Sequence, residues 1–99
     1  MVVGVEIQVD GVTVEQYDRV MGRLGAPAGG SMPDGGLFGW VAATESGIRI
    51  AEVWESEEVF RRFSAVRFGD AAGWVGIVGE PRISFHEVNG LPRTGERGC

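Results

Sequence analysis

His86 and Glu6 are the two side chains of this sequence best suited to acid–base chemistry. His86 is the single histidine of the chain, and imidazole is the side chain whose ordinary pKa lies nearest neutrality. Glu6 interrupts a stretch of otherwise alternating apolar residues. A carboxylate beside an imidazole would orient the ring and favour its protonated form, which is the arrangement of a general acid–base pair. The alternative interpretation is a histidine that faces solvent or is capped by a hydrogen bond, and a glutamate on a solvent face or in a salt bridge between subunits.

Five other residues are candidates for a binding or catalytic site. Tyr17 lies on an apolar helical stripe, where its hydroxyl needs a hydrogen-bond partner, and it can act either as a donor in a site or as a core tyrosine. Glu52 poses the same question as Glu6 and is the next candidate base. Trp40, Trp54 and Trp74 can line a pocket for a flat aromatic or polyketide-like ligand. Their alternative role is to fill the core and an interface between subunits.

The residue types that are absent disfavour several kinds of site. One histidine and one cysteine, the terminal Cys99, cannot supply the usual ligands of zinc or non-haem iron, although His86 alone leaves haem open. All nine basic residues are arginine, which excludes a phosphate-loop lysine and Schiff-base chemistry. The glycines between residues 73 and 79 do not match a dinucleotide fingerprint, and no serine has a nucleophile-elbow context. We therefore expect neither a cofactor nor a metal.

Length and charge restrict the class of protein. A chain of 99 residues, 43% of them hydrophobic, holds one modest core, and we expect a single domain over residues 1–89 followed by a polar tail, 90–99. The net charge of −5 argues against nucleic acid and anionic membrane as partners. No apolar run approaches the roughly 20 residues that cross a bilayer, and no signal peptide is recognisable. We expect a cytoplasmic protein.

Hydrophobic periodicity predicts four strands and two helices. Apolar residues that alternate with a period of two indicate strands, and a spacing of three or four indicates helices. The strands are expected at residues 2–9, 37–43, 48–54 and 82–88, and the helices at 13–24 and from 56 to 69 or beyond, toward 72. Thr13 and Gln16 have the spacing of a capping box. Residues 25–36, with five glycines and two prolines, form a long loop that is either functional or simply loose.

The element order βαββαβ predicts a ferredoxin-like α+β fold, with a four-stranded antiparallel sheet and both helices on one face. The first and last strands are neighbours in this topology, so Glu6 can lie beside His86. We expect Tyr17 to point its hydroxyl into the same space and Trp40 to form part of the wall. Because apolar residues occupy both sides of the first three strands, the other face of the sheet needs cover. A second copy of the chain is the economical cover, and we expect a homodimer.

Three segments carry a resemblance to a known group of proteins. Residues 12–18 (VTVEQYD) after an alternating first strand, 53–56 (VWES) and 85–89 (FHEVN) resemble the small dimeric α+β barrel proteins, which include the antibiotic-biosynthesis monooxygenase-like domains. The resemblance covers roughly residues 2–89 and implies the fold and the dimer. This superfamily holds cofactor-free monooxygenases, haem-degrading enzymes, dismutases, isomerases and cyclases, and its catalytic residues differ from branch to branch.

Two functions from different classes follow from these patterns. The first is a cofactor-independent tailoring enzyme, monooxygenase-like or a cyclase or isomerase, which acts on a hydrophobic natural-product-like substrate. Either reaction can begin with proton abstraction and stabilisation of the enolate that results. The second is a non-catalytic dimeric module that binds a ligand or a partner. A pocket between the helices and the sheet, lined by Glu6 or His86 together with tryptophans, would favour the enzyme, whereas a pocketless core with those residues in solvent would favour the module.

Overall fold

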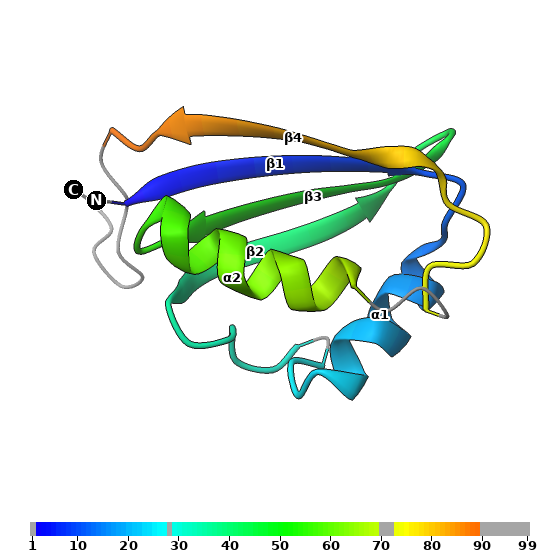
Figure 1. Cartoon of the computed structure of the whole chain (residues 1–99), viewed down its shortest axis with the longest axis horizontal. Helices are drawn as coiled ribbons and strands as arrows, with labels where there is room; N and C mark the ends of the chain where they lie inside the picture. The colour runs from blue at the N-terminus through cyan, green and yellow to red at the C-terminus, as the bar shows by residue number, and fades with distance from the viewer. Residues whose placement is uncertain (1, 28, 70–72, 90–99) are drawn as a thin grey trace, which may run out of the picture.

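The computed structural model describes residues 2–27, 29–69 and 73–89. Its elements are β1 (Val3–Asp10), α1 (Val14–Arg23), β2 (Gly36–Ala43), β3 (Gly47–Trp54), α2 (Glu57–Phe68) and β4 (Val78–Glu87). The strands form one antiparallel sheet in the order β2-β3-β1-β4, and both helices lie on the same side of it (Figure 1). The predicted ferredoxin-like α+β fold is confirmed.

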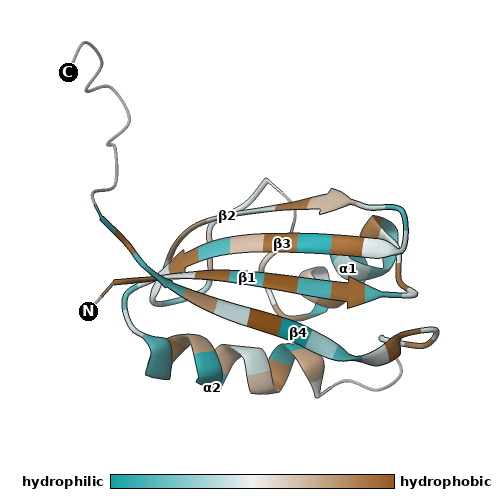
Figure 2. Cartoon of the chain, turned by 90° about the horizontal axis from the view of Figure 1, so that it is seen from above, coloured by the Kyte–Doolittle hydropathy of each residue, from teal (hydrophilic) through white to brown (hydrophobic). Residues whose placement is uncertain are grey.

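The sheet has two faces of different character. We call the face under the helices the inner face and the opposite one the outer face. On β1, Val5, Ile7 and Val9 are buried on the inner face, while Glu6 and Gln8 alternate with them on the outer face. The same alternation of apolar and polar residues is visible along the strands in Figure 2. The side chains of each strand are therefore divided between two separate surfaces, and those on different faces cannot contribute to the same site.

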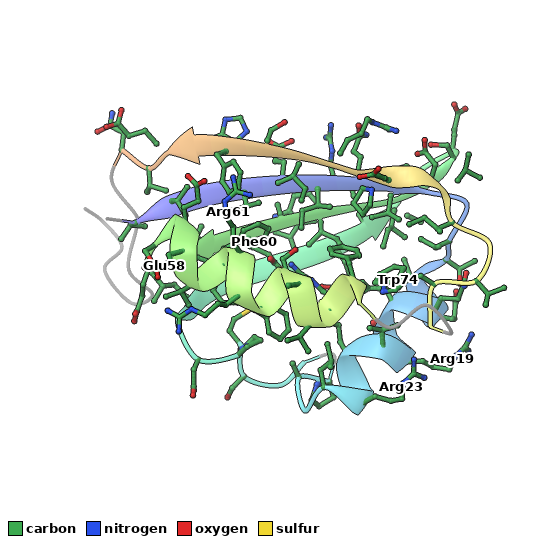
Figure 3. All side chains as sticks on the ribbon, viewed as in Figure 1. Arg19, Arg23, Glu58, Phe60, Arg61 and Trp74 are labelled. Carbon is green, nitrogen blue, oxygen red and sulfur yellow. The ribbon has the colours of Figure 1, made fainter. Side chains whose placement is uncertain are left out.

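Aromatic side chains fill the space between α2 and the sheet. Trp54 of β3 packs against Phe60 and Phe63 of α2, with ring centroids 5.9 and 5.5 Å apart. Phe60 also meets the edge of Phe85 on β4, at 5.6 Å. Figure 3 shows Phe60 between the helix and the sheet. Rings at such distances add packing energy beyond their buried area, and they fix α2 over β3, β1 and β4.

The start of α1 is defined by the expected capping box. The Thr13 hydroxyl accepts a hydrogen bond from the Gln16 backbone N–H at 3.1 Å, and the Gln16 side chain accepts one from the Thr13 backbone N–H at 3.0 Å. Two N–H groups that would otherwise lack partners are satisfied in this way. Tyr17 and Met21 face the core, whereas Arg19 and Arg23 project away from the sheet (Figure 3). The box thus sets the rotation of the helix that carries Tyr17.

Two boundaries differ from the sequence prediction or lie beyond the described residues. β4 begins at Val78, not at Arg82, and contains Pro81. Proline is tolerated there because β4 is an edge strand, and its register with β1 shifts between Gln8 and Asp10. α2 ends at Phe68 with Gly69 as its cap, and its expected extension over 70–72, like the tail 90–99, falls outside the described residues. None of the described helices is both long and apolar enough to cross a membrane.

Candidate functional site

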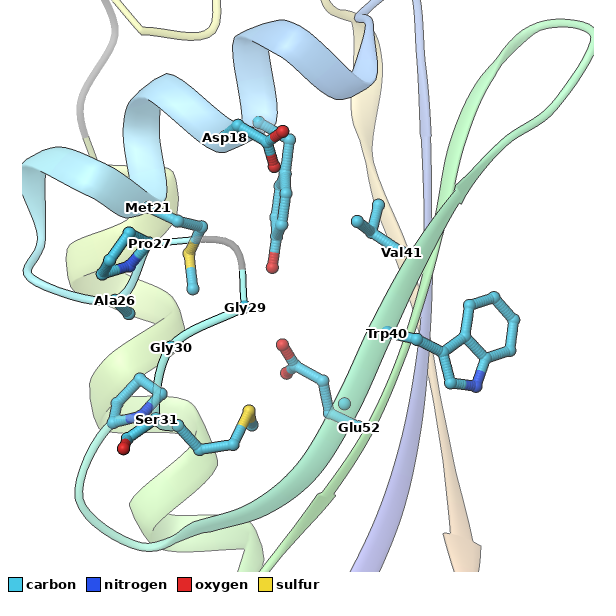
Figure 4. Close-up of a pocket in the computed structure, with 14 residues that line it drawn as sticks. Asp18, Met21, Ala26, Pro27, Gly29, Gly30, Ser31, Trp40, Val41 and Glu52 are labelled. Carbon is cyan, nitrogen blue, oxygen red and sulfur yellow. The ribbon is translucent and has the colours of Figure 1, made fainter.

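A cavity of about 260 Å³ lies between α1, the inner face of β2 and β3, and residues 26, 27 and 29–33. Tyr17, Asp18 and Met21 line it from α1, and Glu52 lines it from β3. Glu52 points from the sheet into this space, as Figure 4 shows. The remaining lining residues come from β2 and the segment between α1 and β2: Ala26, Pro27, Gly29, Gly30, Ser31, Met32, Pro33, Gly39, Trp40 and Val41. Its volume is just below the ~300–1,000 Å³ of pockets for drug-sized molecules, so it suits a small ligand.

The polar centre beside this cavity is a buried ion pair between Glu52 and Arg67. One Glu52 oxygen lies 2.7 Å from Arg67 Nη1, and the other lies 3.1 Å from Nη2. Trp54 Nε1 donates a further hydrogen bond to Glu52, at 2.9 Å. Both charged side chains are almost fully buried, with 3% and 0% exposure. Three N–H groups donate to the carboxylate and take up most of its roughly four acceptor sites, so Glu52 serves to hold Arg67 in place.

Aromatic rings surround the Arg67 guanidinium, whose carbon lies 5.0 Å from the Phe63 ring centroid and 5.2 Å from that of Phe68. Burial lowers the pKa of Arg67, but the hydrogen bond and the charge of Glu52 more than compensate, so the net shift is upward. Its Nε is buried with no hydrogen-bond partner among the described residues. The guanidinium is thus a permanent positive charge in an environment of low polarity, where electrostatic interactions are strong.

Tyr17 connects this charge to the cavity. Its hydroxyl oxygen accepts a hydrogen bond from Arg67 Nη1 at 3.2 Å, and the side chain lines the cavity. Burial is the main cause that raises the pKa of Tyr17 above its ordinary value, so the hydroxyl keeps its proton at neutral pH. A hydroxyl that accepts one bond can still donate its own hydrogen. Tyr17 can therefore donate to an oxygen of a bound ligand, with Arg67 directly behind it.

Arg67 was not among the residues singled out from the sequence, although a signal was present. Phe60, Phe63, Ser64 and Arg67 recur at the three- and four-residue spacing of a buried helical stripe. An arginine at such a position is almost never fully buried without an acidic partner. Glu52, the acidic residue of the β3 strand, could be that partner. Pairing a charge on the buried stripe of α2 with a charge on the inner face of β3 would have predicted this centre.

Glu6 and His86 lie side by side on the outer face. His86 Nε2 is 3.8 Å from a Glu6 oxygen, and Arg49 Nε is 4.0 Å from the other. All three side chains are about half exposed. The expectation that Tyr17 shares a space with this pair is corrected, because β1 places Glu6 on the face opposite α1. The sheet itself separates Tyr17 from Glu6 and His86.

The three tryptophans are divided in the same way. Trp54 and Trp74 are buried beneath the helices, 0% and 4% exposed. Trp54 donates to Glu52, and Trp74 donates to the Arg67 carbonyl oxygen at 2.8 Å and packs against Tyr17. Trp40 contributes to the cavity only from its backbone side, because its ring lies across β2 from Glu52 (Figure 4). The indole of Trp40 belongs to the outer face and is 48% exposed.

The described residues contain no group of three or more histidine, cysteine, aspartate or glutamate side chains that could hold a metal ion. The cavity offers a ligand an apolar wall, the neutral Tyr17 hydroxyl backed by a buried cation, and three further polar residues, Asp18, Ser31 and Glu52. This arrangement can bind a planar apolar molecule and stabilise negative charge that develops on one of its oxygens.

Comparison with known proteins gives a result at the level of structure. No family model matches the sequence, and no curated protein does. The solved structures that resemble the fold include the following two. One, from Deinococcus radiodurans and assigned as an antibiotic biosynthesis monooxygenase, is 14% identical with a TM-score of 0.58, over 94% of this chain and 97% of that one. The other is SnoaB, a cofactor-independent oxygenase from Streptomyces nogalater, 14% identical with a TM-score of 0.52, over 91% and 93% of the two chains. This chain therefore shares the fold of these two structures, a ferredoxin-like α+β fold, as predicted from its sequence.

Proposed function

We propose that this protein is a cofactor-independent small-molecule tailoring enzyme whose substrate is a compact, hydrophobic phenol or enol bound in the cavity under α1. The observation that carries the proposal is the position of the Tyr17 hydroxyl, which lines the cavity and accepts a hydrogen bond from the buried Arg67. The resemblance in fold to a cofactor-independent oxygenase is consistent with this class of reaction.

The proposed chemistry begins with loss of a proton from the substrate. Negative charge then develops on its oxygen, and Tyr17 donates a hydrogen bond to that oxygen. Arg67 stabilises the charge through Tyr17, because a buried guanidinium is already oriented and needs no rearrangement during the reaction. The electron-rich enolate that results can react with dioxygen or rearrange within the molecule. Oxygenation and cyclisation or isomerisation thus share this first step.

Asp18 is the proposed acceptor of the substrate proton. It lines the same cavity from α1 and is partly exposed, so the proton can pass on to solvent. Glu52, considered as a base from the sequence, is given a different role, since Trp54 and Arg67 already occupy its oxygens. We assign Glu52 to positioning Arg67, and through it Tyr17.

The experiment is oxygen uptake and product analysis by mass spectrometry with a panel of one- to four-ring phenols and their quinol forms. Replacing Tyr17 with Phe removes the donor but keeps the ring, and we expect kcat to fall about 10²- to 10³-fold, as for loss of an oxyanion donor. Asp18→Asn should lower kcat as well. If Tyr17→Phe turns over at the rate of the unmodified protein, the cavity is not the site of the chemistry.

We further propose that the outer face binds a second copy of the chain. Phe38 and Trp40 of β2 are 55% and 48% exposed on this face, and Ala51 and Val53 lie beside them on β3. The half of the face formed by β1 and β4 carries charges of both signs, with Arg82 2.9 Å from Asp10. A flat surface with an apolar half and a half of mixed charge can pair with itself around a twofold axis.

The alternative is a non-catalytic module that binds a ligand or a partner. The exposure of Glu6 and His86 favours it, while the cavity between α1 and the sheet favours the enzyme. The two are distinguished by turnover: a module would bind phenols in the cavity, or a partner on the outer face, without converting any of the panel.

A further inference from the structure

We infer that Met32 is the residue that sets the length of ligand which the cavity accepts. This inference rests on the proposed function, because it concerns the same cavity. Met32 lies on the segment between α1 and β2 and lines the cavity beside Gly39 of β2, which is also next to Glu52. It is partly buried and packs against the core.

Two glycines of β2 make room for the Met32 side chain. A methyl group at Gly39 would lie 3.3 Å from both the sulfur and the Cε of Met32 and 3.2 Å from the Cγ of Glu52, and one at Gly36 would lie 2.8 Å from the Met32 Cε. Both glycines pair with inner-face residues of β3, Glu52 and Trp54. Met32 therefore occupies a slot along β2 that the absence of two side chains creates. Without its side chain, the cavity would extend along this slot toward Trp54.

Backbone hydrogen bonds fix the chain on both sides of Met32, so its side chain forms a fixed boundary of the cavity. Downstream, the Gly36 N–H donates to the Pro33 carbonyl at 2.8 Å, and the Glu55 N–H donates to the Gly35 carbonyl at 2.9 Å. Gly35 has a φ of +88°, a conformation that residues with a side chain rarely adopt. Upstream, the Ala26 N–H donates to the Met21 carbonyl at 2.8 Å. These bonds tie both ends of the segment to regular elements.

The chemistry of the side chain suits a boundary for aromatic ligands. A thioether is apolar and polarisable, and it makes favourable contacts with the edge of an aromatic ring. With one ligand oxygen bound to Tyr17, the far edge of a short ring system would meet the Met32 sulfur. A longer ring system would have to displace the side chain from its slot. The cavity should thus select ring systems by length.

The experiment compares two probes, 1-naphthol with two rings and 1-hydroxypyrene with four, by fluorescence titration of the full chain. The unmodified protein should bind 1-naphthol more tightly. Met32→Ala should reduce this preference about tenfold or more by tightening 1-hydroxypyrene binding, on the scale that pocket methylenes discriminate ligands. Met32→Leu preserves the volume and should keep the original preference. Asp34→Ala, on the same segment but outside the cavity, is the matched control, and circular dichroism checks the fold of each variant.

A complementary variant narrows the slot. Gly39→Ala requires the side chains of both Met32 and Glu52 to give way by a few tenths of an ångström. The part of its effect that acts through Met32 is the difference between backgrounds, so Gly39→Ala should weaken 1-naphthol binding more in the unmodified protein than in Met32→Ala. An unchanged preference in Met32→Ala, with 1-naphthol binding still weakened by Tyr17→Phe, would overturn the inference and leave the proposed function intact. Failure of the unmodified protein to bind either probe would overturn both, whereas binding of the probes without turnover of any phenol in the panel would overturn the proposed enzyme and leave the role of Met32 intact.

Discussion

Arg67 of α2 and Glu52 of β3 face each other in a two-pronged ion pair, at 2.7 and 3.1 Å, with essentially no contact with solvent. The pair joins a helix to the middle of the sheet, and its cation also holds the Tyr17 hydroxyl of the other helix. The charge of Arg67 therefore connects the consecutive elements β3 and α2 with α1, which is distant from both in sequence. Their geometry is fixed before any ligand arrives, which is the condition for electrostatic stabilisation of a reacting anion.

Breaking this pair on one side should destabilise the protein strongly. In Glu52→Gln the Arg67 charge stays buried without its counterion, and loss of one partner of a buried pair costs about 3–5 kcal/mol. That is a large part of the roughly 5–15 kcal/mol that stabilises a typical domain. Urea denaturation measures the change. The double variant Glu52→Leu/Arg67→Met, which removes both charges, should recover most of the loss; a double variant as unstable as the single one would contradict the argument.

Tyr17 should titrate above the ordinary tyrosine value of 10.0, because burial disfavours its phenolate. It is the only tyrosine in the chain, so phenolate absorbance of the folded protein reports it alone. Since the folded pKa is raised, its contribution to stability is complete below about pH 10 and is lost as the pH rises through the folded pKa. The folded protein should therefore titrate at higher pH than the protein in urea. A midpoint at or below 10.0 in the folded state would count against this environment.

Substitutions on the outer face separate the cavity from the alternative acid–base pair. If the reaction takes place in the cavity under α1, Glu6→Gln and His86→Ala should each keep kcat within a few-fold of the unmodified protein. The reason is that the sheet lies between these two residues and Tyr17. A general acid–base group would instead account for about 10²- to 10⁴-fold in rate. A loss of that size in either variant, with the fold intact, would move the reaction to the Glu6–His86 pair.

The proposed dimer should depend on the apolar half of the outer face. Trp40→Glu places a charge where the partner sheet would pack, and it should convert a dimer to a monomer at micromolar concentration in size-exclusion chromatography with light scattering. Val66→Glu is the matched control, because Val66 is also an exposed hydrophobic residue, at 59%, but lies on α2. A stable monomer before any substitution, or equal dissociation in both variants, would refute this interface.

The strands and helices could be predicted from the sequence because each carries a regular pattern. The alternation in β1 and the Thr13–Gln16 box of α1 are local signals, and the structure has both. Even the adjacency of Glu6 and His86 followed from the topology. What could not be read locally was the face to which each polar residue points, since a shift of register by one residue reverses it. Arg67 was overlooked for a related reason: its partner Glu52 comes from another element, and only the folded chain brings the two together.

The division of β2 and β3 between two surfaces has a consequence for how such a protein can diversify. Neighbouring positions along one strand, such as Gly39 and Trp40, have different roles. Gly39 shapes the cavity, and Trp40 lies in the proposed interface. Mutations can therefore accumulate on alternate positions with little interference, so that the ligand can change while self-association persists, or the reverse. Because side chains alternate between the two faces of each strand, ligand binding in the cavity and self-association through the outer face can evolve independently in this small protein.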